Sequence, residues 1–263
     1  MQRDTVIPMT SPKPEAGRRA TYFISDLHLH PDRAELFTLL YDFIDDISCD
    51  AEALYILGDL FEFWIGDDII DTPTGEIYTP LFDKLKSLSD SGTKLFFIQG
   101  NRDFLARKKF ARRIGARLLA DQQVIDLYGT QALIMHGDTL CTDDKSYQRM
   151  RALLRNRILQ RLYLMQSTQK RQRIADKTRQ VTQKETGVKS SMILDVNQQQ
   201  VEKVLKKGGM GILIHGHTHR PGEHQFKLDD QSARRIVLGD WHDKSSYLKV
   251  TQENGSLAMQ LVY

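Results

Sequence analysis

Five short apolar segments of this chain each run directly into polar residues that could bind a metal ion. The segments are 21–25, 53–57, 95–98, 132–135 and 212–214, and the polar blocks after them are Asp26-Leu-His28, Gly58-Asp59, Gly100-Asn101-Arg102-Asp103, His136-Gly137-Asp138 and Gly216-His217-Thr218-His219. Apolar, β-prone runs of this length predict buried strands. In open α/β folds, ligands collect beyond the carboxyl ends of the strands. We therefore expect the five blocks to meet in one crevice.

The residue types in these blocks favour a divalent cation. Taken singly, each block is a weak signal, because an Asp or Asn after a strand is most often a turn residue. Taken together they supply two carboxylates, four imidazoles and one amide, namely Asp26, His28, Asp59, Asn101, His136, His217 and His219. Mixed oxygen and nitrogen donors suit Mn²⁺, Fe²⁺ or Zn²⁺, and the sequence does not choose among these three ions.

The order of the expected elements predicts an α/β fold. Helical spacing covers 34–47 and 79–89, and strand-like runs at 235–239, 247–250 and 257–262 dominate the end of the chain. Strands that first alternate with helices and then follow one another indicate a mixed, two-sheet core. We assign 20–144 and 191–263 to this core, and 1–19, with three prolines, to a disordered extension.

Residues 145–190 differ from the rest and predict a basic helical cap inserted into the core. From Lys145 to Lys189 there are thirteen Lys or Arg and only two acidic residues. Leu154, Ile158, Leu162 and Met165 follow helical spacing. This apolar stripe could pack the cap or face an anionic membrane, and both readings stay open. Aromatic residues are too scarce there for the stacking that nucleic-acid binding uses, so we expect no nucleic-acid partner.

The remaining composition favours a cytoplasmic protein. No apolar run approaches the roughly 18 residues of a spanning helix, and the N-terminus lacks the apolar block of a signal peptide. Cys49 and Cys141 lack the spacing of a metal site, and we expect both to be reduced thiols.

The order D-x-H, GD, GN, HG, GHxH resembles the calcineurin-like metallophosphoesterase superfamily over residues 21 to about 245. The resemblance implies a four-layer αββα sandwich with two metal ions. One ion would be held by Asp26, His28, Asp59 and His219, and the other by Asp59, Asn101, His136 and His217, so that Asp59 bridges them. Paired ions can hold a hydroxide and a phosphoryl oxygen together for in-line attack on phosphorus.

Arg102 directly follows the Gly100-Asn101 pair, at a position where many members of the superfamily carry histidine. Arginine stays protonated near neutral pH and cannot act as a general acid, although it can neutralise a phosphate. A phosphate leaving group needs no general acid. Arg102 therefore favours a pyrophosphate substrate, with Asp59, Asn101 and Arg102 as the catalytic residues.

Longer strings resemble a narrower family, the UDP-2,3-diacylglucosamine pyrophosphatases of lipid A biosynthesis; they are Ile24–Leu29, Ala53–Glu62, Trp64–Asp68, Gly100–Leu105, Met135–Asp144 and His215–Pro221. The resemblance implies two Mn²⁺ ions bridged by Asp59 and attack of the metal-held hydroxide on the α-phosphorus. The products would be UMP and 2,3-diacylglucosamine 1-phosphate. It also implies a peripheral location on the cytoplasmic face of the bacterial inner membrane through the basic cap, and we expect a monomer.

The same resemblance implies substrate contacts from Asn101, Arg102, Asp144, His217, Thr182, Thr186 and Lys189, with the two threonines standing where Ser and Asn are usual. The loop 69–76 is longer than is usual in this family, and we assign it no role. Two alternatives stay open. One is a related phosphoesterase acting on a soluble nucleotide diphosphate or phosphodiester, and the other is a metal-dependent scaffold without catalysis.

Overall fold

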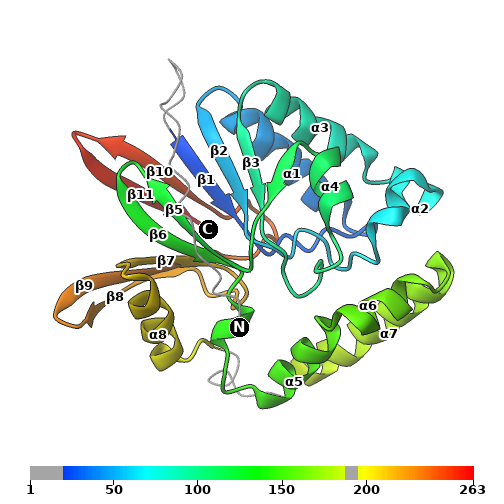
Figure 1. The fold of residues 1–263 in the computed structure, drawn as a ribbon. Coiled ribbons are helices and arrows are strands. Elements are labelled where there is room, and N and C mark those ends of the chain that lie inside the picture. Colours follow the sequence, from blue (N-terminus) through cyan, green and yellow to red (C-terminus); the bar gives the residue numbers. More distant parts are fainter. Residues whose placement is uncertain (1–19, 187–194) are drawn as a thin grey trace.

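Two β-sheets form the centre of the protein, seen in a computed structural model that describes residues 20–186 and 195–263, without the side chains of 180–186 (Figure 1). The first sheet has the order β11-β10-β1-β2-β3-β4 and the second the order β5-β6-β7-β9-β8. The strands are β1 (Ala20–Ile24), β2 (Ala51–Ile56), β3 (Lys94–Phe97), β4 (Ala116–Leu118), β5 (Gln122–Leu127), β6 (Thr130–Met135), β7 (Ile212–His215), β8 (Gly222–Leu228), β9 (Gln231–Val237), β10 (Tyr247–Glu253) and β11 (Ser256–Val262).

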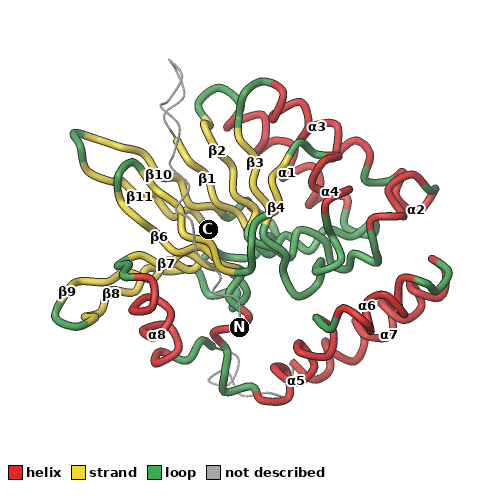
Figure 2. The backbone as a smooth tube through the Cα atoms, viewed as in Figure 1, coloured by secondary structure: helices red, strands yellow, loops and turns green. Residues whose placement is uncertain are grey.

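Helices cover the outer faces of both sheets. They are α1 (Ala34–Ile47), α3 (Thr79–Asp90), α4 (Lys108–Arg113) and α8 (Gln198–Gly208). The short α2 (Pro73–Glu76) lies at the periphery, and α5 (Lys145–Leu154), α6 (Arg157–Leu164) and α7 (Thr168–Thr186) lie apart from the sheets (Figure 2). Helices α1, α3 and α4 pack on the first sheet, and α8 packs on the second.

Three apolar cores separate four layers. One lies between α1, α3, α4 and the first sheet, with Leu40 and Phe82 fully buried. The second lies between the sheets and includes Phe23 of the first sheet and Ile134 and Ile236 of the second. The third joins the second sheet to α8. Burying one large apolar side chain contributes about 1.5–3 kcal/mol, so each layer is held by its own core. The expected four-layer α/β architecture is confirmed.

Strand direction brings the predicted blocks to one edge of the fold. In the first sheet β1, β2, β3 and β4 are parallel, with Ile24 opposite Ile56 and Ile56 opposite Phe97. In the second sheet β6 and β7 are parallel as well. The carboxyl ends of parallel strands share an edge. The residues after β1, β2, β3, β6 and β7 are therefore neighbours, although they are far apart in sequence.

Helices α5, α6 and α7 form the cap, which is fastened to this edge by arginines. Arg155 donates to the carbonyl of Gly100 at 3.1 Å. Arg171, almost fully buried, donates to the carbonyl of Ile65 at 2.6 Å and to Asp68. A buried, charge-assisted contact fixes orientation better than an exposed ion pair does. Within the described part of the expected cap, 145–190, helices α5, α6 and α7 are present, and the proposed segment limits stay predictions.

The apolar stripe expected along this cap is broken between two helices. Helix α5 ends at Leu154, and the side chain of Asn156 caps α6 by accepting from the amide of Ile158 at 2.9 Å. Leu154 lines a cavity, whereas Ile158, Leu162 and Met165 are 69%, 53% and 80% exposed. The prediction of one continuous stripe was wrong, because a new helix starts between its first two members. The reading in which all four residues only pack the cap does not hold.

Other expectations differ in detail. The segment 69–76 is helical rather than a loop, with a 3₁₀ turn at Asp67–Asp71 followed by α2. Strands β4, β5 and β8 were not expected. The proposed disordered extension, 1–19, lies outside the described residues. Among the helices of the described ranges, none combines the length and apolar character needed to cross a bilayer.

Candidate metal centre

The backbone that carries the expected ligands is held in an unusual conformation. Among the described residues, nine that are not glycine have positive φ, and five of these are expected ligands: Asp26 (57°), His28 (49°), Asp59 (51°), His217 (71°) and His219 (53°). Left-handed backbone costs a residue with a side chain about 1–3 kcal/mol and persists only where the surrounding structure enforces it. Such outliers cluster at functional sites, which supports the assignment of these strand ends.

Two glycines allow the strand ends to approach one another. A Cβ on Gly100 would overlap Asp59 Oδ1, and a Cβ on Gly216 would overlap the side chains of Ser25 and Asp26. The absence of a side chain therefore lets the Gly-Asn and Gly-His loops close onto the carboxylates of neighbouring strands.

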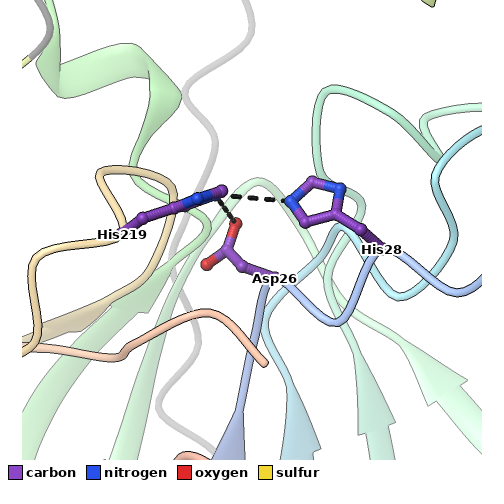
Figure 3. A group of neighbouring side chains, drawn as sticks. All are labelled: Asp26, His28 and His219. Atoms are coloured by element: carbon purple, nitrogen blue, oxygen red, sulfur yellow. Dashed lines mark hydrogen bonds and ion pairs between the residues drawn. The ribbon is translucent and has the colours of Figure 1, made fainter. Parts of the chain in front are cut away.

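Asp26, His28 and His219 form the first group of ligands (Figure 3). His219 Nε2 lies 3.4 Å from Asp26 Oδ1 and 3.3 Å from His28 Nε2. Asp26 is fully buried; its Oδ2 accepts from Ser25 Oγ and from the amide of His217, while Oδ1 forms no hydrogen bond of ordinary geometry with the described residues. An unsatisfied buried carboxylate oxygen is costly. This oxygen, facing two imidazoles, fits a cation.

Asp59 joins this group to a second one. Its Oδ1 accepts the amide of Arg102 at 2.8 Å, whereas its Oδ2 lies 3.9 Å from His28 Nε2 and 3.7 Å from His136 Nε2. His136 Nε2 in turn lies 2.9 Å from Asn101 Oδ1. Asp59 therefore stands between the two groups, and Oδ2 is the oxygen that faces both.

His217 stands beside His136, with the ring centroids 5.0 Å apart. All seven expected ligands thus lie close together: Asp26, His28 and His219 form one compact group, Asp26, Asp59 and His136 form a second, and Asn101 and His217 adjoin His136. The donor set, rich in carboxylate and imidazole, fits divalent first-row ions.

The charges of the centre favour a bound cation. Burial lowers the pKa of His219, but the carboxylates of Asp240 and Asp26 outweigh it and raise the pKa to about 10. Burial and the neighbouring His136 lower the pKa of His217 to about 4, which leaves a neutral imidazole with a free lone pair at pH 7. Metal ions bind neutral imidazole and displace protons. A cluster that holds a proton this firmly will also attract a metal ion.

Three carboxylates outside the expected ligand set support the ligands. Asp103 accepts the amides of Gly100 and Leu60 at 2.7 and 2.8 Å and so ties the loop after β3 to the loop after β2. Asp240 Oδ2 lies 3.1 Å from His219 Nδ1, and Glu62 Oε2 lies 3.4 Å from His28 Nδ1. Asp240 follows Gly239 at the end of β9, so the same Gly-Asp pattern could have found it.

A cavity of about 770 Å³ opens between this centre and the cap. Asn101, Arg102, Asp144 and His217, four of the expected substrate contacts, are among the residues that line it, and their contacts with a substrate stay predictions. The rest of the wall is mostly apolar and includes Phe63, Trp64, Phe104, Leu105, Met150, Leu153, Leu154, Leu159, Tyr163, Ile174 and Ala175.

The three other expected substrate contacts come from the last part of the cap. Thr182 and Thr186 belong to α7, but their side chains are not described, and Lys189 lies outside the described residues. These three contacts stay predictions.

The fold and this centre together define a phosphoesterase. The model of the calcineurin-like phosphoesterase family matches residues 20–221, and the chain belongs to that family. Membership, together with the clustered ligands, implies a divalent metal ion.

Curated proteins of similar sequence indicate which members of this family the chain resembles. The chain is 47% identical over 238 residues to the UDP-2,3-diacylglucosamine hydrolase of Salmonella paratyphi B, covering 90% of this chain and 98% of the relative. It is 45% identical over 233 residues to the hydrolase of the same name from Serratia proteamaculans, covering 89% of this chain and 95% of that relative. A solved archaeal phosphodiesterase is 13% identical with a TM-score of 0.44, covering 92% of this chain and 99% of that chain.

Proposed function

We propose that this protein hydrolyses the pyrophosphate bond of UDP-2,3-diacylglucosamine, giving UMP and 2,3-diacylglucosamine 1-phosphate for lipid A biosynthesis. The observation that carries the proposal is the cavity, because its lining combines candidate metal ligands and Arg102 with a largely apolar wall. A substrate with a diphosphate at one end and two acyl chains at the other needs both surfaces. The two relatives named UDP-2,3-diacylglucosamine hydrolase support this choice of substrate.

The metal ions are proposed to be two Mn²⁺. When bound, such ions would supply Lewis-acid activation of water and would neutralise phosphoryl oxygens. Asp26, His28, Asp59 and His219 would hold one ion, and Asp59, Asn101, His136 and His217 the other. Asp59 is positioned for the shared role because its Oδ2 faces a histidine of each group.

Arg102 would neutralise the diphosphate. Its backbone is fixed by the hydrogen bond to Asp59, and its guanidinium lies 5.0 Å from the centroid of the Phe63 ring, at the cavity wall. A rigid, permanently charged guanidinium binds phosphoryl oxygens without transferring a proton. Attack at the α-phosphorus would release the sugar 1-phosphate, a stable anion that leaves without protonation. Asp144, Thr182, Thr186 and Lys189 are proposed to contact the sugar and phosphates.

The outer face of α6 is proposed to dock on the cytoplasmic surface of the inner membrane. Ile158, Leu162 and Met165 are exposed and follow i, i+4, i+7 spacing, so they share one helix face, and Arg157 and Arg161 are exposed beside them. Apolar side chains flanked by arginine bind anionic lipid surfaces. Replacing Ile158, Leu162 and Met165 by Ser should release the protein from phosphatidylglycerol vesicles in sedimentation, while Ile77→Ser, an exposed apolar residue outside the cap, should not.

The reaction is tested with UDP-2,3-diacylglucosamine, Mn²⁺ and ¹⁸O-labelled water, with products read by mass spectrometry. The proposal predicts one ¹⁸O in UMP and none in the sugar 1-phosphate, because the new bond forms at the α-phosphorus. Label in the sugar phosphate would refute the site of attack. Asp59→Ala should abolish turnover. An active wild-type protein that hydrolyses soluble UDP-sugars or phosphodiesters but not the diacylated substrate would favour the alternative phosphoesterase, and a metal-loaded protein without hydrolysis would favour a scaffold.

A further inference from the structure

Glu62 connects a metal ligand to the cap through a single carboxylate. One oxygen, Oε2, lies 3.4 Å from His28 Nδ1, and the other, Oε1, lies 3.5 Å from Arg179 Nε on α7. The side chain of Glu62 is only 13% exposed, and that of Arg179 is 32% exposed. We propose that Glu62 is a positioning residue that orients His28 for metal binding and makes the affinity of that ligand depend on how the cap is seated. This inference rests on the metal site of the proposed function.

The backbone holds Glu62 in place independently of its side chain. Its amide donates to the carbonyl of Leu29 at 3.0 Å, and Leu29 and Phe61 form a parallel β-bridge. Leu29 is the residue that follows His28. The carboxylate and the imidazole are therefore carried by two segments that are hydrogen-bonded to each other, so their separation does not depend on a mobile loop.

The contact fixes which nitrogen of His28 is available to a metal ion. His28 Nδ1 is buried and has no hydrogen-bond partner of ordinary geometry within the described part of the chain, so Glu62 is the acceptor at hand for an Nδ1–H. With the proton on Nδ1, the lone pair is on Nε2, which lies 3.3 Å from His219 Nε2 and 3.9 Å from Asp59 Oδ2. A carboxylate behind a ligating histidine sets its tautomer and raises its basicity, and losing it typically weakens metal binding 10- to 100-fold.

Glu62 differs from Asp240 in the contact that its second carboxylate oxygen makes. Asp240 stands behind His219 in the same manner, but its other contact is His242 at 2.7 Å, outside the cap. Arg179 instead belongs to α7, which lines the cavity through Ile174, Ala175 and Thr178. If α7 shifts, the guanidinium of Arg179 moves relative to the Glu62 carboxylate. The position of that carboxylate then changes, and the orientation of the His28 ring changes with it.

The test is calorimetric titration of metal-free protein with Mn²⁺. Glu62→Ala should weaken binding about 10- to 100-fold. Glu62→Gln should lose less affinity for Mn²⁺, because the amide oxygen of the glutamine can still accept from His28 Nδ1–H. Arg179→Gln should weaken binding by a smaller factor, and in the Glu62→Ala background it should have no further effect. Two matched controls should bind as wild type: Glu223→Gln, which breaks an exposed ion pair between Glu223 on β8 and Arg234 on β9, and Arg173→Gln, at an exposed position on α7.

Measurements of kcat and KM distinguish the positioning role of Glu62 from a general loss of folded structure. In Glu62→Ala, raising Mn²⁺ to saturation should restore most of kcat with an unchanged KM for the diacylated substrate. Wild-type affinity for Mn²⁺ in Glu62→Ala would overturn the inference while leaving the proposed function intact. Additive effects of the Glu62 and Arg179 substitutions would overturn the link to the cap. A wild-type protein that binds no Mn²⁺ would overturn the metal site and the inference together.

Discussion

Replacing Arg171 by methionine should loosen the cap without disturbing the sheets. Methionine keeps an apolar stem in place of the aliphatic part of the arginine side chain, but it lacks the guanidinium that donates to Asp68 and to the carbonyl of Ile65. Asp68 is 56% exposed, so water compensates most of its loss and the ion pair contributes about 1 kcal/mol. The carbonyl of Ile65 is left unsatisfied in a buried setting, which costs a further 1–3 kcal/mol or so. We expect a total of about 2–4 kcal/mol.

Hydrogen exchange measures this loss directly. A cost of about 2–4 kcal/mol corresponds to amides in α7 that exchange roughly 30- to 1,000-fold faster, while amides in β1 and β2 exchange as in wild type. Arg173→Met is the control, because Arg173 is exposed on the same helix. Unchanged exchange in α7 of Arg171→Met would refute the view that this buried arginine seats the cap.

Three further predictions concern the metal centre. Gly100→Ala should weaken Mn²⁺ binding at least tenfold by calorimetry, because its Cβ would displace Asp59, and wild-type affinity would contradict this steric argument. Removing Mn²⁺ from protein held at 100 times Kd should cost about 2.7 kcal/mol per site and lower Tm by about 5–10 °C for each site in scanning calorimetry; an unchanged Tm would argue against a folded-state site. Burial raises the pKa of Asp138, but the charges of His136 and Arg151 lower it to about 2. Its carboxylate therefore stabilises the metal-free protein fully above pH 4, and about 2 kcal/mol is lost as the pH falls toward 2. Denaturant unfolding at pH 5 and 2.5 should show a smaller loss in Asp138→Asn, and equal losses would count against this assignment.

Local patterns predicted the elements whose signal is local. The apolar spacing at 34–47 predicted a helix with the bounds that α1 has, Ala34–Ile47, because its buried face repeats every three or four residues. Five buried strands, β1, β2, β3, β6 and β7, were predicted within one or two residues of their ends because each is a short apolar run. Edge strands lack this signal: β8 has exposed or half-exposed side chains throughout, so no apolar run marks it.

Contacts across the fold could not be read from the sequence. Helix α4 is capped from a distance by Asp67, whose carboxylate accepts the amides of Arg107, Lys109 and Phe110, about forty residues further along the chain. Glu62 has no distinguishing pattern because its role depends on His28 on the neighbouring strand end and on Arg179 in the cap. The candidate metal ligands were predictable because they follow directly after five apolar strands, whereas the residues that orient them are defined by tertiary structure.

The most direct test of the metal centre is anomalous diffraction from crystals of Mn²⁺-loaded protein. The structure predicts two manganese peaks at the carboxyl ends of the central strands, one beside Asp26, His28 and His219 and one beside Asn101, His136 and His217, with Asp59 between them. Peaks elsewhere, or none in crystals of protein that hydrolyses its substrate in solution, would contradict the view that these distant segments fold together to bind a pair of cations.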